Sequence, residues 1–486
     1  MTNECSNTSN TLDLYYNAFD KLGYSKPLAE KRALLCDEVI EQFMLRGKLW
    51  HEKNDNVDLI IAGSRGEGCG IFSDVDVLFV HLNVKCFEEF PAILPERPSQ
   101  AVFQLDFKDV PKGYTMLKLI KIDDLVDDSQ RANDQYLTNI RAALVQNSGS
   151  YYLRNDRLII HDIEVFLHVN VTKETVFADI NGPARSFIID AKYINLSLDL
   201  VQAFPCSCPS VGYNWCNRPR KYNWPSKDLI ETVKGLNVLV VPVGKKDATD
   251  EILQWRISQT LAEQALVRSF NDPQIKIYVA LKMLVRHELK PVCENITSYI
   301  VKNTIFWVFE KSRPVYTKAD FLDMLLYSLR YLKVSIEWKY LPNYMMPSRN
   351  LLENKVSVRD RTALVGRLND MIEEGCDVLL RCPLVNEMFE MPHNRLQEKI
   401  IYRELLDQIF LSTVALQPTD IKLYLRFLYE LKVQNKEHFI PKWIFAISPY
   451  IRRSNPLGFF SRMISMTDEE IIVRLFEGWK LGYYKE

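Results

Sequence analysis

The spacing of apolar residues predicts a helix followed by a sheet in the first half of the chain. Within residues 27–50, apolar side chains recur every three to four positions, which predicts one long amphipathic helix (Leu35, Val39, Ile40, Phe43 and Met44). Later segments are rich in Val, Ile, Leu and Phe, and several alternate with period two, which predicts strands at residues 57–63, 74–82, 157–171 and 194–204. We therefore expect an α+β protein with a mixed sheet packed against helices.

The second half of the chain has a helical pattern. From about residue 248 onward, apolar residues follow three-to-four residue spacing with almost no glycine, whereas residues 205–247 are loop-rich apart from the apolar run 236–244. The whole chain has only 17 glycines in 486 residues, which favours long helices over a turn-rich β fold. We expect three parts: a core with the long N-terminal helix (1–246), a helical lobe (247–394) and a helical C-terminal extension (395–486).

Composition and charge exclude several classes of protein. Lys plus Arg number 61 against 62 Asp plus Glu, so the net charge of -1 argues against a tail-driven nucleic-acid binder. No apolar stretch approaches the roughly 18 residues needed to span a bilayer, and the first ten residues lack a signal-peptide pattern. Ten scattered cysteines fit reduced thiols, Cys206, Cys208 and Cys216 included. We expect a cytoplasmic protein.

Two aspartates follow a Gly-rich turn. Gly63-Ser64 ends the first predicted strand, and Asp74 and Asp76 open the next. Alternate strand residues share a face, so both carboxylates point the same way, about 6.5 to 7 Å apart. Beside the backbone N–H groups of a turn, this pair suits a metal-bound triphosphate. The alternative is an edge strand with a solvated acidic face, but the upstream Gly-Ser makes the motif more specific than a bare D-x-D.

A third carboxylate lies on a later strand. Asp199 occupies the polar side of the strand at 194–204, whose other side is formed by Ile and Leu. A carboxylate there is costly unless it is paired or metal-bound, and a structural ion pair with an arginine is the alternative. Together with Asp74 and Asp76, Asp199 fits phosphoryl transfer with two metal ions.

These residues resemble the signature of a known family. The Gly63-Ser64 turn, the Asp74-x-Asp76 pair and the SLDLVQAF strand are similar to those of the cGAS-like receptors, within the male-abnormal (Mab) nucleotidyltransferase superfamily. The similarity continues through five segments and spans roughly residues 55–355: WPSKDLI (224–230), WRISQTLAEQAL (255–266), ALKMLV (280–285), TSYIVKNTIFW (297–307) and LPNYMMPSRNLL (341–352).

The resemblance implies a role for each matching residue. Gly63 and Ser64 would hold the donor triphosphate, and the three aspartates would bind Mg²⁺ or Mn²⁺. The remaining nucleotide contacts would be Lys282 and Ser298 to phosphates, Tyr299 stacked on a base, Arg256 and Ser258 at a base edge, and Glu263 as a weaker candidate. Without the resemblance, Lys282 and Tyr299 would read as ordinary helix residues.

The resemblance further implies a bilobal nucleotidyltransferase fold and a function in innate immune signalling. Such an enzyme would join ATP and GTP, or other nucleoside triphosphates, into a cyclic dinucleotide read by a STING-type receptor, and would form a dimer on its activating ligand. The zinc insertion that grips DNA in cyclic GMP-AMP synthase is absent, because no cysteine lies between 217 and 292. DNA is therefore not implied as the activating ligand, and the resemblance instead suggests double-stranded RNA, to which some cGAS-like receptors respond, or another ligand. The alternatives are an RNA-tailing polymerase and a catalytically silent Mab-family scaffold.

One basic segment is a candidate nucleic-acid surface. Residues 217–246 contain seven basic and two acidic side chains, a local excess of five, with Tyr222 and Trp224 among them. The predicted contacts are Arg218, Arg220, Lys221, Lys245 and Lys246. The alternative is a solvated basic loop that balances nearby acidic helices.

Overall fold

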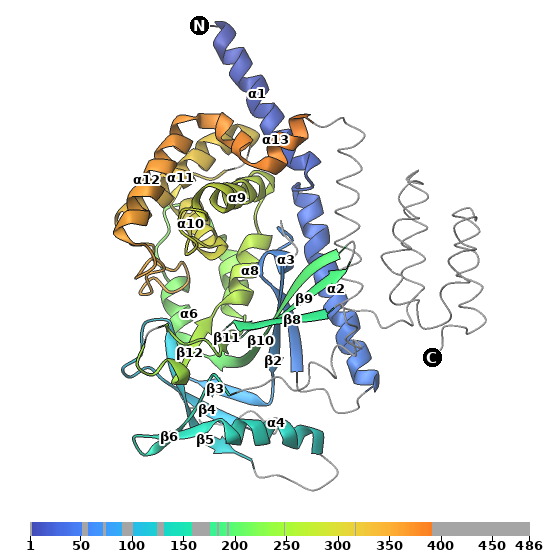
Figure 1. Ribbon diagram of the computed structural model, residues 1–486, viewed down its shortest axis with the longest axis vertical. Coiled ribbons are helices and arrows are strands. Elements are labelled where there is room, and N and C mark those ends of the chain that lie inside the picture. The colour runs from blue at the N-terminus through green and yellow to red at the C-terminus, as the bar shows by residue number, and fades with distance from the viewer. Residues whose placement is uncertain are drawn as a thin grey trace, which may run out of the picture.

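The computed structural model describes most of the first 390 residues (Figure 1). The described ranges are 2–50, 57–70, 74–89, 101–123, 131–157, 175–181, 184–191, 194–246, 248–315 and 317–390, with only the backbone described at 2–11, 39, 42–50, 74, 131–135 and 175–198. All but the first residue of the strand predicted at 157–171 lies outside these ranges, as does the predicted extension at 395–486.

Two long helices lie at the N-terminus. The predicted helix at 27–50 is confirmed as α2 (Lys26–Trp50), which packs beside β1, α3 and α8 (Figure 1). An additional helix, α1 (Thr2–Lys21), was not predicted from the polar start of the chain. It forms because Tyr15, Tyr16 and Phe19 are buried against the helical core. The other helices are α3 (Gly63–Gly66), α4 (Arg131–Ala142), α6 (Pro209–Cys216), α7 (Lys227–Lys234), α8 (Thr260–Arg268), α9 (Asp272–Leu284), α10 (Ser298–Lys311), α11 (Phe321–Glu337), α12 (Val358–Glu373) and α13 (Pro383–Glu390), with short helical turns η2 (Glu251–Leu253), η3 (Val285–Leu289), η4 (Lys318–Asp320) and η5 (Gly375–Arg381).

The described strands form one twelve-stranded sheet. They are β1 (Val57–Ala62), β2 (Asp74–His81), β3 (Val84–Phe87), β4 (Ala101–Asp106), β5 (Tyr114–Ile122), β6 (Leu144–Asn147), β7 (Ser150–Leu153), β8 (Thr175–Asn181), β9 (Ala184–Ala191), β10 (Ile194–Ser207), β11 (Val238–Val241) and β12 (Gln254–Ser258). Their main order is β1-β2-β10-β11-β12-β5-β4-β3, with β6 and β7 attached to β5 and with β8 and β9 attached to β10. Helix and strand together fit the expected α+β class.

Strand β10 joins the two parts of the sheet. Its residues 197–203 pair in parallel with β2, and residues 194–200 pair antiparallel with β9. Its last residues pair with β11 and with β3. Because β10 has 14 residues, it is long enough to serve both parts of the sheet.

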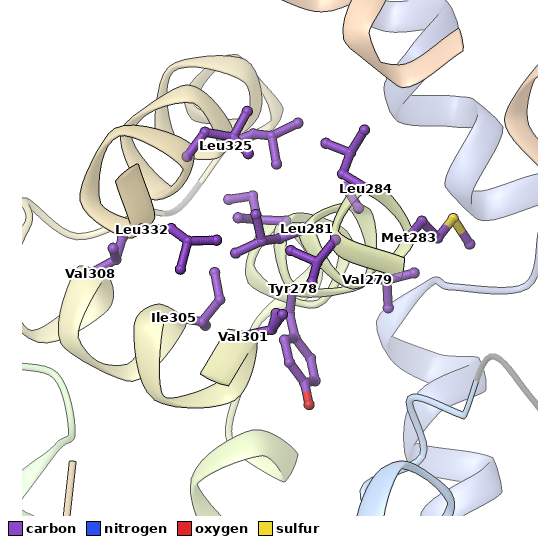
Figure 2. Packing of buried hydrophobic residues seen from close by; sticks show 14 of the residues in the cluster. Tyr278, Val279, Leu281, Met283, Leu284, Val301, Ile305, Val308, Leu325 and Leu332 are labelled. Atoms are coloured by element: carbon purple, nitrogen blue, oxygen red, sulfur yellow. The ribbon is translucent and has the colours of Figure 1, made fainter. Parts of the chain in front are cut away.

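The main core lies among the helices. Apolar side chains of α9, α10 and α11 interdigitate, as Leu281, Ile305 and Leu332 do in Figure 2, and all three are fully buried. Burying a side chain of this kind contributes about 1.5–3 kcal/mol. Two smaller clusters, one around Phe103 and Trp255 and one around Leu78 and Leu239, cover the sheet. Among the described helices, none is both long and apolar enough to cross a bilayer.

The start of the predicted helical half differs from expectation. Residues 254–258 form strand β12, and helix begins only at Thr260. Trp255 and Ile257 are buried while Arg256 and Ser258 are half-buried, which is a period of two. The helical spacing of the residues that follow concealed this short alternation.

Candidate active site

The Gly-Ser turn after β1 lies in close contact with an aspartate of β2. Gly63 has φ of +60°, a conformation that glycine adopts readily. A Cβ at this position would lie 2.2 Å from the Asp76 Oδ2 atom, so only glycine leaves room for the carboxylate. The turn then continues into the short helix α3, which contains Ser64.

Helix α8 holds this turn in place. The Gln264 side chain donates to the Ile61 carbonyl at 3.1 Å, and the Arg268 Nε atom donates to the Gly66 carbonyl at 2.8 Å. The same arginine forms a two-point ion pair with Asp37 of α2, at 2.6 and 2.9 Å. Helix α8, itself tied to α2, therefore fixes the backbone on both sides of Ser64.

Two of the three predicted carboxylates lie on adjacent strands in register. Asp76 of β2 is paired directly with Asp199 of β10 in the parallel ladder. Neighbouring strands are separated by about 4.8 Å, and paired residues share one face of the sheet. Both aspartates are half-buried. Asp74 opens β2 opposite Ser197, and its side chain lies outside the described atoms.

Ser64 and Lys282 are in contact. The Lys282 Nζ atom donates to the Ser64 Oγ atom at 2.6 Å and lies 3.4 Å from the Cys69 carbonyl oxygen. Lys282 is on α9, and only 4% of its surface is exposed. The interior of the helical core thus presents an ammonium group to the turn, where a phosphate would need a counter-charge.

A buried ion-pair network links the turn to α8 and α10. Lys302 of α10 pairs with Glu67 of the turn and, at 3.4 Å, with Glu263 of α8. Burial alone would lower the pKa of Lys302, but the two carboxylates raise it above its ordinary value. Tyr278 of α9 donates to Glu67 at 3.1 Å. The predicted contact Glu263 is therefore already bound by a lysine.

Tyr299 belongs to the same network. Its hydroxyl donates to Glu263 Oε1 at 2.8 Å and accepts from the Asn343 side chain at 2.7 Å. Burial and the nearby Glu263 raise the pKa of Tyr299, so the phenol stays protonated. Asn343 lies in the 341–351 loop. Its backbone N–H donates to the Arg349 carbonyl at 2.8 Å, and this hydrogen bond closes the loop. The ring orientation is therefore fixed from two sides.

The other predicted nucleotide contacts lie on β12 and at the start of α10. Arg256 is half-buried, and its pKa is lowered by burial and by the nearby Arg349. The Ser258 hydroxyl is 2.7 Å from the Thr260 hydroxyl. Ser298 is the exposed first residue of α10, one position before Tyr299. Glu263 and Tyr299 both lie close enough to Arg256 to act on the charge of its guanidinium group.

The predicted basic surface divides into interior and exterior residues. Arg218 and Arg220 both pair with the buried Glu310, at 2.7 and 3.1 Å. Arg218 also stacks over Trp307, 4.4 Å from its ring centroid. Their guanidinium groups therefore bind a carboxylate of the helical core. The remaining lysines are outside it: Lys221 and Lys246 are exposed, and Lys245 pairs with Glu353 at 3.1 Å.

The carboxylates suit a hard divalent cation. Asp76 and Asp199 offer oxygen ligands from adjacent strands, and because Gly63 has no side chain the Asp76 carboxylate can lie directly against the turn. Among the described side chains there is no group of three His, Cys, Asp or Glu residues arranged for a metal ion, and Asp74 is not among those side chains. Asp76 and Asp199 would therefore hold Mg²⁺ or Mn²⁺, with Asp74 as the expected third ligand.

Sequence reasoning missed the residues that support the predicted ones. Lys302 and Asn343 bind the predicted contacts Glu263 and Tyr299, and Glu67 in turn binds Lys302, yet none of the three was singled out. Glu67 lies inside the Gly-rich loop, and Lys302 and Asn343 lie inside segments that carry the family resemblance. Their sequence signal was a polar residue within an apolar helix or loop, which gains meaning only when its partner is known.

One known protein family matches the part of the chain that contributes helical residues to this site. Residues 273–370, which include Lys282, Tyr299 and Asn343, match the family model described as the Mab-21 protein HhH/H2TH-like domain. The matched region covers α9 to α12, the helical part of the molecule. The match supports a relationship of this chain to the Mab-21 and cGAS-like nucleotidyltransferase family.

Proposed function

We propose that this protein is a metal-dependent nucleotidyltransferase that joins two nucleoside triphosphates into a cyclic dinucleotide. The observation that carries the proposal is the pairing of Asp76 with Asp199 beside a turn in which Ser64 contacts Lys282. Carboxylates and a phosphate counter-charge thus meet at one end of β2, as phosphoryl transfer requires. The Mab-21 family match supports the transferase class.

Each part of the site has a task in this proposal. The Ser64 hydroxyl and the Lys282 ammonium would bind the donor triphosphate, which sits against the turn that α8 holds rigid. Tyr299, fixed by Glu263 and Asn343, would stack on a base, and Arg256 would read its edge. A divalent ion at the carboxylates would supply neutralisation of the phosphate charge and a lowered pKa for the attacking hydroxyl.

The proposal extends to sensing. We place the enzyme in the cytoplasm, as an innate immune sensor activated by double-stranded RNA, with ATP and GTP as substrates and a STING-type receptor for the product. In support, the nine described cysteines are free thiols, and Lys221 and Lys246 remain exposed for phosphate contacts. Dimer formation on the ligand is part of the same proposal.

The test is incubation of the purified chain with four labelled nucleoside triphosphates and Mg²⁺ or Mn²⁺, with double-stranded RNA, DNA or no polymer. Phosphatase treatment and chromatography follow. We expect a compact, phosphatase-resistant product that requires one polymer. Asp76→Asn and Asp199→Asn should each abolish it, whereas Asp58→Asn, which changes an exposed carboxylate on the neighbouring strand β1, should not.

The other outcomes decide between the alternatives. A ladder of linear products would identify a tailing polymerase and exclude obligatory cyclisation. If neither Mg²⁺ with ATP nor Mn²⁺ with ATP raised the melting temperature, the catalytically silent scaffold would replace the enzyme. An active Asp76→Asn/Asp199→Asn double variant would overturn the catalytic assignment.

A further inference from the structure

A group of three cations lies beside the predicted base-binding residues. Arg256 of β12 is paired in register with Tyr114 of β5, so the two side chains share one face of the sheet. Arg349, in the 341–351 loop, extends over the same tyrosine, with its guanidinium carbon 5.4 Å from the ring centroid. Arg349 and Arg256 therefore both approach Tyr114, one over its ring and the other from the neighbouring strand.

The backbone around Tyr114 is shaped for this approach. A Cβ at Gly113 would lie 2.6 Å from the Cδ atom of Arg349, so glycine lets the arginine stem pass. The Gly113 carbonyl accepts a hydrogen bond from the Ile257 amide at 3.0 Å, which fixes β12 next to Arg256. Arg349 is thus held close to Arg256 by packing, despite the like charges.

Lys355 is the third cation. Its carbonyl accepts hydrogen bonds from the Asn295 side chain at 2.9 Å and from the Cys293 thiol at 3.7 Å, which ties it to the segment before α10. Burial, and then Arg349 and Arg256, lower the pKa of Lys355. The two hydrogen bonds place the Lys355 backbone beside the segment that leads into Tyr299, and the two arginines lie near its side chain.

Two carboxylates near these cations are bound elsewhere. Glu353, two residues before Lys355, pairs with Lys245 at 3.1 Å, and Glu263 accepts from Tyr299 and Lys302. Within the part of the chain whose side chains are described, none of the three cations forms an ion pair. Half-buried like charges repel and are costly to desolvate, so a site that keeps them unpaired is suited to an anionic ligand.

We propose that Arg349 and Lys355, next to the base-reading Arg256, form a second phosphate-binding subsite, which takes the phosphate groups of the acceptor nucleoside triphosphate. The identity of this ligand rests on the proposed function. The subsite is separate from the Ser64–Lys282 contact at the turn, and it adjoins Tyr299 through the loop that contains both Asn343 and Arg349. Arg349 offers a planar fork and Lys355 a compact charge for the same phosphate chain.

The test is calorimetric titration of the full chain with inorganic tripolyphosphate in EDTA, so that neither metal nor catalysis is needed. The wild-type protein binds two equivalents if the turn also takes the anion without metal, and one if it does not. Arg349→Gln/Lys355→Gln should bind one equivalent fewer, and each single variant should bind at least tenfold more weakly at that site. The control Lys112→Gln/Arg359→Gln removes two exposed cations near Gly113 and Lys355 and should match the wild type.

Each outcome decides the proposal. Unchanged stoichiometry and affinity in the single and double variants would overturn the subsite, whatever the nucleotide assay gives. Loss of one equivalent together with no product in the nucleotide assay would keep the anion subsite and reject the nucleotidyltransferase function. Melting curves without ligand identify any unfolded variant. If the double variant is unfolded, the affinities of the two single variants decide whether the subsite exists.

Discussion

The Lys282 ammonium lies 2.6 Å from the Ser64 hydroxyl, although 218 residues separate them in the chain. The contact connects the helical core to the turn after β1. Since Lys282 is almost fully buried, its charge is directed at this turn and away from bulk water. The predictions below begin from this contact and from the ion pairs around it.

We expect Lys282→Met to remove triphosphate binding while the protein stays folded. The partners of Lys282 include a hydroxyl and a carbonyl oxygen, and the desolvation cost of the ammonium disappears with its charge, which offsets part of the lost hydrogen bonding. Lys276→Met on the same helix is the matched control. Lys276 pairs with Asp20 and Asp272 at 2.6 and 2.7 Å, so its loss leaves two unpaired carboxylates. That variant should lose stability and keep binding, as thermal melts with and without ATP will show. Wild-type ATP binding by Lys282→Met would contradict the assigned role.

Lys302→Met should destabilise the fold by about 3–5 kcal/mol, because Glu67 and Glu263 would remain buried without their cation. Adding Glu67→Gln should recover part of this loss. The pKa of Lys302 is raised in the folded state, so the pair stabilises fully below the ordinary lysine pKa and is lost only when the pH rises through the folded value. Urea unfolding at pH 6 and pH 9 should therefore give the same loss. Full additivity of the two substitutions would argue against the pair.

His81 should make the protein sensitive to mild acid. It is buried and stacked on Tyr136 with 4.1 Å between ring centroids, and burial lowers the pKa of His81 to about 3. The unfolded chain takes up a proton near pH 6.5 and the folded chain does not, so stability falls as pH drops from 6.5 toward 3. Between pH 7 and pH 5 the loss should be about 2 kcal/mol. His81→Phe should reduce this pH slope by one proton, measured by urea unfolding at several pH values. An unchanged slope would contradict the prediction.

The two kinds of basic residue should behave differently toward double-stranded RNA. Lys221→Gln/Lys246→Gln should weaken binding and lower the slope of log affinity against log salt by about 2, because two exposed phosphate contacts are lost. Arg220→Gln should instead lower the melting temperature, since it removes a buried partner of Glu310. Binding at several salt concentrations distinguishes the two effects, and an unchanged slope in the lysine variant would exclude these lysines as contacts.

The half of the site that contains the carboxylates could be predicted from local sequence. The Gly63-Ser64 turn and the alternation around Asp76 and Asp199 depend on period and spacing within a few residues, and the structure has both strands where they were expected. Local sequence could not predict that the two aspartates are direct neighbours. Parallel pairing of β2 with β10 joins residues that are 123 positions apart in the chain.

The remainder required knowledge of distant partners. Strands β3 and β6 have four residues each, too few for a clear alternation. Arg218 and Arg220 looked like a surface patch because Glu310, which binds both, lies about 90 residues later. Arg349 drew no attention until Tyr114 was found beside it. For these arginines, the role became visible only with the tertiary partner.

Strand β10 has a consequence for how variants of this protein are interpreted. A shift of one residue in its pairing with β2 would turn Asp199 to the opposite face and bury it among apolar side chains. The same strand supports β9, β11 and β3, so a change at any of its 14 residues reaches the aspartate pair through the backbone. Enzymatic turnover would therefore report on correct assembly of the sheet, and an inactive β10 variant would carry no information on chemistry until its strand register had been measured.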